Sequence, residues 1–217
     1  MVTSPRAWTV LLTVVVLGLV SDLASKYAAF HWIPETPVSF TREQALAVGP
    51  QNLEYLLPDP PPVVVVAPSV LELKLVLNPG AVFGLGAGKR WFFVVMTGAA
   101  FAFALWMFTR WTTRRDTAAH IGIGLLLSGG LGNLYDRLVY ACVRDFLHPL
   151  PGVRLPFGWS WPWGGRDVWP YVSNIADLWL IIGVGILIVY SWRQPQAALA
   201  PERAQAPKPA NKQAPKP

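Results

Sequence analysis

Long apolar runs constrain the fold of this chain more than any other feature of its sequence. Four runs approach the about 20 residues that an α-helix needs to cross a bilayer: residues 8–30, 91–109, 118–138 and 174–192. Of the 217 residues, 53% are hydrophobic and only 14% are charged. This composition is poor for a soluble domain and typical of a polytopic membrane protein. The sequence therefore predicts an all-α membrane protein with four transmembrane helices, which form one domain over residues 1–193.

The first run has a competing interpretation as a cleaved signal peptide, because Arg6 precedes an apolar core. We favour a retained helix, because the run is long enough to span and carries Asp22 and Lys26 in its last turns. These two residues are four apart and share a helix face. They form an ion pair, with Lys26 reaching toward the interface, or they line a site within the membrane. The two interpretations are compatible.

The segment 31–89 is too polar and too rich in proline to span a bilayer. Within it, leucines alternate with Glu72 and Lys74, which is the period-2 pattern of a half-buried strand. Asn-Pro-Gly at 78–80 then turns the chain, and we expect a short helix within 42–57. The segment is therefore predicted to form a small sheet on the membrane surface.

The second polar segment, 141–172, is rich in Trp, Pro and Gly, and we expect an extracytoplasmic loop there. Amphipathic aromatic side chains at this density favour the lipid headgroup layer. After the last apolar run, residues 194–217 are mainly Pro, Ala, Gln and Lys. This composition predicts a disordered tail. Its basic residues suit an anionic lipid surface better than a nucleic acid.

The distribution of basic residues predicts the topology. Arg6, the arginines at 110–115 and Arg193 with the tail share one side if four helices alternate. The positive-inside rule makes that side cytoplasmic, so both termini lie there. The polar residues of the helices then gather near the outer leaflet. Polar residues with unrelated structural roles would be distributed over both leaflets, so this clustering favours a functional site.

Two acidic residues at the outer end are candidates for catalysis, namely Asp145 and Asp177. Two carboxylates in a poorly solvated site cannot both ionise easily, and they share a proton. One then activates water while the other donates a proton, as in aspartic proteases. Asp177 has a second interpretation, because Asn174 and Asp177 have the spacing of a helix N-cap and its acidic partner. Both interpretations stay open.

The remaining polar residues have simpler interpretations. Asp136 is expected to pair with its neighbour Arg137, which is also able to reach backbone carbonyls or Asn133 one turn earlier. The three histidines lie at different edges, and Cys142 has no histidine at a regular spacing, so neither a zinc site nor a cysteine nucleophile is indicated. We expect no metal and no organic cofactor.

Small residues recur every four positions in the third run, at Gly124, Ser128 and Gly132. Such a stripe lets neighbouring helices approach closely. Helix packing alone is a sufficient explanation for it.

Five short motifs resemble, in order, those of the bacterial lipoprotein signal peptidases (signal peptidase II): SDLASKY, NPGAVFG, GGLGNLYDR, VRDF and SNIADLW. Together they span most of residues 21–179. The resemblance implies a four-helix membrane aspartic protease with a small periplasmic β-cradle, whose catalytic pair is Asp145 and Asp177. It also implies residues that contact substrate or hold the pair, namely Asn78, Gly80, Asn133, Arg137 and Asn174. We expect Asp22, Lys26 and Asp136 to support the site.

The resemblance further implies the substrate and the location. Lipid-modified prolipoproteins would be cleaved before the diacylglyceryl-cysteine, at the outer face of the bacterial cytoplasmic membrane. We expect a monomer surrounded by membrane lipids, without a nucleic-acid partner. The stretch before Asn78 and the loop between Asp145 and Asn174 look longer than in typical members. Because of the longer loop between Asp145 and Asn174, the resemblance defines neither the lid over the site nor the substrate preference.

Two other classes of function compete with a protease. A small transporter or proton-relay protein would use Asp22, Lys26 and the aspartates as its pathway, and it predicts polar groups through the full depth of the bilayer. The inner halves of the runs are apolar instead. A non-catalytic membrane scaffold predicts that the aspartates tolerate substitution by Asn.

Overall fold

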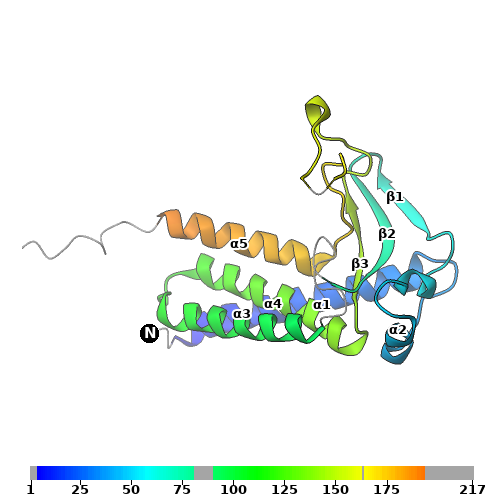
Figure 1. The fold of residues 1–217 in the computed structure, drawn as a ribbon. Helices are drawn as coiled ribbons and strands as arrows, with labels where there is room; N and C mark the ends of the chain where they lie inside the picture. Colours follow the sequence, from blue (N-terminus) through cyan, green and yellow to red (C-terminus); the bar gives the residue numbers. More distant parts are fainter. Residues whose placement is uncertain (1–3, 81–89, 163, 194–217) are drawn as a thin grey trace, which may run out of the picture.

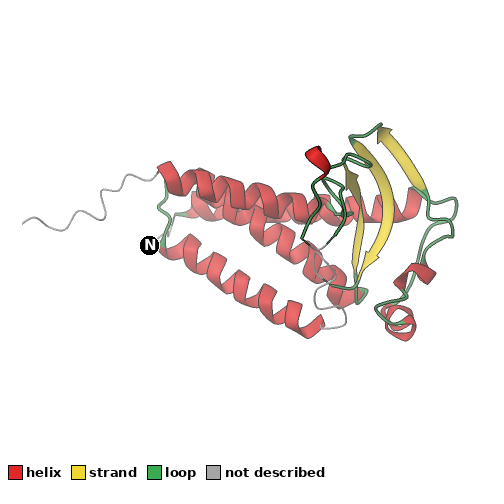
Figure 2. Cartoon of the chain, turned by 45° about the horizontal axis from the view of Figure 1, so that its top comes forward, coloured by secondary structure: helices red, strands yellow, loops and turns green. Residues whose placement is uncertain are grey.

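The computed structural model describes residues 4–80, 90–162 and 164–193. Four long helices form a bundle, and a small sheet covers one of its ends (Figure 1, Figure 2). The long helices are α1 (Pro5–Trp32), α3 (Arg90–Arg110), α4 (Thr117–Val139) and α5 (Ile175–Arg193). The predicted disordered tail and the part of the NPGAVFG motif after Gly80 lie outside the described residues.

Helix α4 is the centre of the bundle, because it packs against α1, α3 and α5. Its small residues permit this packing. A Cβ atom at Gly132 would overlap the Asp22 carboxylate, and Ser128 lies against Gly18 of α1. A Cβ at Gly124 would also press on α1. The prediction that this stripe allows close helix packing is confirmed.

Three helices are long and apolar enough to cross a membrane, namely α1, α3 and α5. Many of their large apolar side chains are exposed, as expected for side chains that face lipid. Helix α4 is of similar length but is not among these candidate spans. The expected four spans are therefore supported for three helices, and a crossing by α4 stays a prediction.

The sheet has three antiparallel strands in the order β1 (Val63–Ala67), β2 (Leu71–Asn78) and β3 (Val143–Pro149). The strand predicted from the alternating leucines is confirmed as β2. Strand β3 corrects the expectation of a loop from residue 141 onward. It forms because its backbone pairs with β2 along most of that strand, and the register places Val76 opposite Asp145.

A hydrophobic core joins the sheet to the end of α1. It contains Phe30, Leu75 and Phe146, together with the buried Cys142. Burial raises the pKa of the Cys142 thiol to about 12, as expected for a cysteine that serves as a small apolar residue. Beside this core lie α2 (Arg42–Val48) and a 3₁₀ turn, η1 (Leu53–Leu56), which confirm the short helix expected within 42–57. The core holds β2 and β3 over the outer end of α1.

Residues 150–172 form a projection that we call the finger. Its two arms pair through a β-bridge between Arg154 and Asp167, and the short 3₁₀ helix η3 (Pro156–Gly158) lies at its tip. Figure 1 shows the finger projecting sideways from the helices, beyond α5.

Candidate active site

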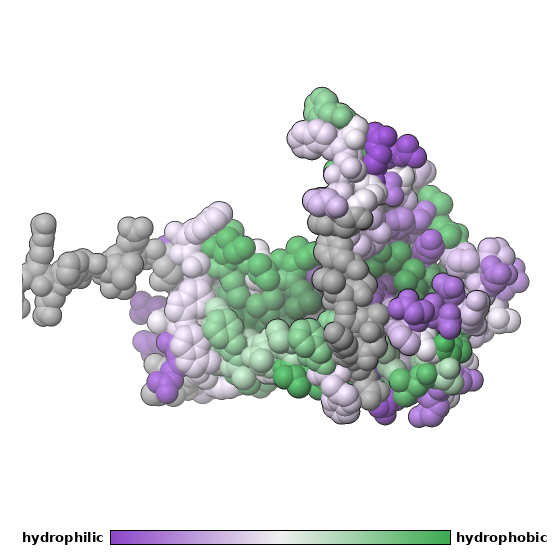
Figure 3. All heavy atoms as spheres, in the orientation of Figure 1, coloured by the Kyte–Doolittle hydropathy of each residue, from purple (hydrophilic) through white to green (hydrophobic). Residues whose placement is uncertain are grey.

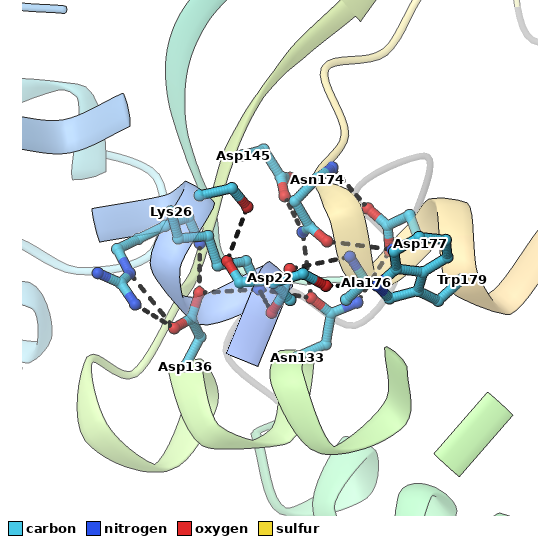
Figure 4. Close-up of polar contacts among 12 residues, drawn as sticks. Asp22, Lys26, Asn133, Asp136, Asp145, Asn174, Ala176, Asp177 and Trp179 are labelled. Carbon is cyan, nitrogen blue, oxygen red and sulfur yellow. Dashed lines mark hydrogen bonds and ion pairs between the residues drawn. The ribbon is translucent and has the colours of Figure 1, made fainter. Parts of the chain in front are cut away.

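Polar side chains from five elements meet where the bundle joins the sheet (Figure 4). Helix α1 contributes Asp22 and Lys26, and β2 ends at Asn78. The other predicted site residues come from the turn after β2 and from α4, β3 and α5: Gly80, Asn133, Asp136, Arg137, Asp145, Asn174 and Asp177. The structure therefore brings the predicted residues to one end of the bundle.

Asp145 lies on β3 and is buried, with 1% of its surface exposed. Asn174 Nδ2 donates to its Oδ1 over 2.6 Å, and Asn78 Nδ2 donates to its Oδ2 over 3.1 Å. Burial, followed by the charge of Asp177, raises the pKa of Asp145 to about 7, although the two amide hydrogen bonds oppose the shift. Asp145 therefore keeps a proton up to near-neutral pH.

Asp177 lies in the first turn of α5 and is half-buried. Its Oδ2 accepts from the backbone N–H of Asn174 at 3.1 Å, and its own N–H donates to Asn174 Oδ1 at 3.1 Å. These reciprocal bonds cap the helix, as the spacing of the two residues predicted. Asp177 Oδ1 accepts in addition from Asn133 Nδ2 at 2.8 Å. Capping the helix therefore leaves one oxygen of Asp177 directed into the polar cluster.

Asn174 connects the two candidate catalytic aspartates. Its side-chain amide donates to Asp145, and its backbone amide donates to Asp177. The same side-chain amide also donates to Asn133 Oδ1 at 3.1 Å. Figure 4 shows Asp145 and Asp177 on either side of Asn174. Two carboxylates that are 32 positions apart in the chain are thus held by one residue.

Lys26 is a buried cation beneath this pair. Its Nζ lies 2.9 Å from Asp22 Oδ2 and 3.3 Å from Asp136 Oδ2, and it donates to Asn133 Oδ1 at 3.1 Å. The ion pair expected between Asp22 and Lys26 is confirmed. Asp22 Oδ1 also accepts from the backbone N–H of Ala176 at 2.8 Å. Helix α1 therefore holds the first turn of α5, which carries Asp177.

Asp136 pairs with Arg144 rather than with Arg137, which corrects the prediction. Arg144 Nη2 lies 2.8 Å from Asp136 Oδ1, and the Arg144 backbone N–H donates to Oδ2 at 3.0 Å. Arg137 donates instead to the carbonyl oxygens of Asn133 and Gly80, each at 3.1 Å. Asp136 and Arg137 are successive residues of a helix, so their side chains do not face each other and do not pair.

Sequence reasoning missed Arg144 and Trp179. Arg144 stands next to Asp145 in the VRDF motif. Successive strand residues point to opposite faces, and because the strand itself was not predicted, the face that carries Arg144 was not predicted either. The Trp179 indole donates to Gly18 O at 3.2 Å and to Ser21 Oγ at 3.1 Å, which ties α5 to α1. Nothing in the sequence indicates that contact.

The arrangement suits acid–base chemistry on a carbonyl group. A proton-bearing carboxyl and a second carboxylate lie beside amide donors that fix their orientation. Within the described ranges, no group of three His, Cys, Asp or Glu side chains is arranged to hold a metal ion.

An apolar groove of about 650 Å³ runs between α3, α4 and α5. Its lining includes Gly130, which is almost one turn before Asn133 on α4. Hydrophobic side chains cover this face of the bundle in Figure 3. Large apolar side chains from all three helices form its walls, among them Met96, Phe101, Met107, Leu126, Leu180 and Val184. The groove therefore offers a lipid-like surface that ends close to the polar cluster.

Known proteins resemble this chain in sequence. The family model described as signal peptidase (SPase) II matches residues 14–193. The lipoprotein signal peptidase of Desulfitobacterium hafniense is 34% identical over 127 residues, which cover 57% of this chain and 70% of the relative. That of Chlorobium phaeobacteroides is 32% identical over 151 residues, which cover 70% of this chain and 86% of the relative.

Two solved structures described as a bacterial membrane enzyme have a similar fold. One has a TM-score of 0.55 at 21% identity and covers 94% of this chain and 97% of its own. The other has a TM-score of 0.54 at 22% identity and covers 89% and 96%. The match of the family model over most of the chain shows that this protein belongs to the signal peptidase II family, which consists of membrane proteases of the aspartic type.

Proposed function

We propose that this protein removes the signal peptide from diacylglyceryl-modified prolipoproteins, by cleaving the bond before the lipidated cysteine, with Asp145 and Asp177 as the catalytic pair. The family supports the removal of signal peptides from prolipoproteins. The observation that carries the assignment of the pair is the bridge through Asn174, which hydrogen-bonds to both carboxyl groups. The bridge keeps a buried acid next to a half-buried carboxylate.

In the proposed reaction Asp177 is ionised and Asp145 carries the proton. Asp177 removes a proton from water, the water oxygen attacks the scissile carbonyl carbon, and Asp145 donates its proton to the carbonyl oxygen. The product is a neutral gem-diol. Asp177 then returns its proton to the amide nitrogen while Asp145 takes one from a diol hydroxyl. The C–N bond breaks, and this releases the carboxyl end of the signal peptide and the amino group of the cysteine.

The surrounding groups have positioning roles in this proposal. Asn78 and Asn174 orient the Asp145 carboxyl, and Asn133 orients that of Asp177. The apolar groove takes the signal helix of the substrate, while the acyl chains stay in lipid. We place the site near the outer leaflet and both termini in the cytoplasm, because the basic residues gather at the other end of the helices.

The test is cleavage of a lipidated prolipoprotein by purified protein in nanodiscs, with the cut position read by mass spectrometry. Asp145→Asn and Asp177→Asn should each reduce the rate by roughly 10²–10⁴-fold, because each removes one acid–base group. Asp167→Asn is the matched control, since that residue is exposed on the finger, and it should leave the rate unchanged.

Near-normal cleavage by either site variant would refute the assignment of the pair. Loss of activity on treatment of wild-type protein with a metal chelator would point to metal-dependent hydrolysis instead. Cleavage at a site other than the bond before the lipidated cysteine would refute the proposed specificity.

A further inference from the structure

The tip of the finger presents large apolar side chains to the surroundings. Phe157 is 90% exposed and Trp159 is 66% exposed, and their rings lie 6.1 Å apart. Single exposed apolar residues are common on protein surfaces, but an adjacent pair of large aromatic rings on a projection favours an interaction site. Neither ring is explained by the candidate active site.

Hydrogen bonds between the two arms hold these rings away from the rest of the protein. Leu155 N–H donates to Arg166 O at 2.6 Å, and Val168 N–H donates to Val153 O at 2.8 Å. Nearer the tip, the Trp161 indole donates to Asp167 O at 2.9 Å. The finger is therefore a braced hairpin that presents its tip rather than a chain that collapses onto the bundle.

The finger extends along the plane in which a membrane surface would lie. Figure 1 shows it nearly perpendicular to the helices, with its tip level with the N-terminal end of α5. Figure 3 shows a hydrophobic tip and strongly hydrophilic side chains on the side away from the helices. Below the finger, α5 exposes Leu178, Ile181 and Ile182, as a lipid-facing helix does. The tip thus stands to the side of α5, level with the end at which that helix would enter the bilayer (Figure 1).

The charges of the finger fit phospholipid headgroups. Arg154 and Arg166 are exposed, and the Arg166 guanidinium lies close to Gly158 at the tip. Asp167 is the only acidic residue in the segment 150–172, so the sequence of the finger has a net positive charge. Aromatic rings and arginines together are typical of the bilayer interface, where rings lie at the level of the headgroups and guanidinium groups reach phosphates.

We propose that the finger is a membrane anchor, in which Phe157 and Trp159 insert into the phospholipid leaflet beside the first turn of α5. It projects to the side of the bundle (Figure 1). Its contact with lipid fixes how deep the sheet and the polar cluster sit relative to the headgroups. This inference requires only that the helices reside in a bilayer, and it is independent of the proposed reaction.

A nitroxide spin label at Ser160→Cys tests the anchor, because Ser160 is exposed near the tip and both aromatic rings are retained. The native Cys142 is buried and stays unlabelled, as labelling of the wild-type chain should show. In nanodiscs of phosphatidylethanolamine and phosphatidylglycerol, the label should be accessible to oxygen and protected from a water-soluble nickel chelate. A label at Gln51→Cys, exposed between α2 and η1, is the water-accessible reference.

The double substitution Phe157→Ser/Trp159→Ser should restore access of the nickel chelate to the label at position 160. Tyr55→Ser in the same labelled background is the matched control, because Tyr55 is an aromatic residue of 76% exposure on η1, and it should change nothing. A label at position 160 that is as accessible to nickel as the label at position 51 would overturn the proposal. Protection that persists without the two aromatic rings would overturn it as well.

Discussion

Asp145 is the residue whose chemistry the surrounding structure alters most clearly. Burial, with the Asp177 charge beside it, raises the pKa of its carboxyl group to about 7 from the ordinary 3.8. Below that pH the pair holds a proton that can be donated to a carbonyl oxygen. Above it Asp145 has lost this proton and the acid is no longer present. Because the pKa of Asp145 is raised, activity should be lost on the alkaline side of neutral pH.

We predict that kcat for the lipidated substrate falls as the pH rises through about 7, with the midpoint near the pKa of Asp145. The pH–rate profile in nanodiscs measures this directly, and the thermal unfolding temperature at each pH shows whether the protein stays folded. A rate that is constant from about pH 6 to about pH 9 would contradict the role of Asp145 as the acid.

Adding a single methyl group at Gly132 should lower the stability of the protein. A Cβ atom there would overlap the Asp22 carboxylate, which holds both Lys26 and the backbone of Ala176. Gly132→Ala should lower the free energy of unfolding by about 1–3 kcal/mol. It should also lower activity, because the first turn of α5 shifts. Thermal unfolding in detergent measures the first effect.

Gly98→Ala is the control for that substitution, since a Cβ atom at Gly98 of α3 meets nothing within 4 Å. Ala favours a helix over Gly, so the control should be neutral or slightly stabilising. Equal stability of the two variants would show that α1 and α4 are not tightly packed at Gly132.

At the scale of elements, a buried ionic cluster joins α1 to α4 and β3. Lys26 of α1 lies between Asp22 and Asp136, and Asp136 also binds Arg144 of β3. The other half of the bundle is packed mainly with apolar side chains such as Leu11 and Phe108, and its buried His120 is hydrogen-bonded to Thr112 rather than to a charged group. The cluster is thus confined to one end, as a localised site requires and as a relay through the full membrane depth does not.

Removing one charge from this cluster should be far more costly than removing a matched pair. Lys26→Met leaves two buried carboxylates short of a cation, and it should destabilise the protein by about 3–5 kcal/mol. Lys26→Met combined with Asp22→Asn should recover part of that loss. Unfolding of the two single variants and the double variant gives the coupling energy as a thermodynamic cycle. Additive losses would mean that the 2.9 Å contact between Lys26 and Asp22 contributes nothing.

The elements that sequence reasoning found are those with a regular pattern. The apolar runs predicted the helices α1, α3, α4 and α5, and the alternating leucines predicted β2. Strand β3 escaped because Val143, Arg144, Asp145 and Phe146 are all buried, so no alternation of polar and apolar residues marks it. Strand β1 escaped because its valines directly follow a run of prolines.

The sequence predicted which residues belong to the candidate site better than it predicted the contacts between them. Asp145, Asn174 and Asp177 emerged from their positions beside apolar runs and from the resemblance. The partner of Asp136 did not, because it depends on which face of β3 carries Arg144. Such pairings follow from strand register, which local sequence does not specify here.

At the scale of the whole molecule, both described chain ends lie at the end of the bundle away from the sheet (Figure 1). We predict that single cysteines at Arg114 and Asp167, which are exposed and lie before and after α4, react with a membrane-impermeant maleimide from opposite sides. In intact cells the cysteine at 167 should be labelled, and that at 114 only after permeabilisation. Labelling of both without permeabilisation would show that α4 does not cross.

The bond from the Ala176 backbone to Asp22 has a consequence for biogenesis. Helix α1 is synthesised first and α5 last, and the proposed pair takes one carboxyl from β3 and the other from α5. A nascent chain that has already produced Asp145 lacks both its partner and the brace from the first helix. On the proposed mechanism, hydrolysis therefore requires that α5 has been synthesised and has docked against α1.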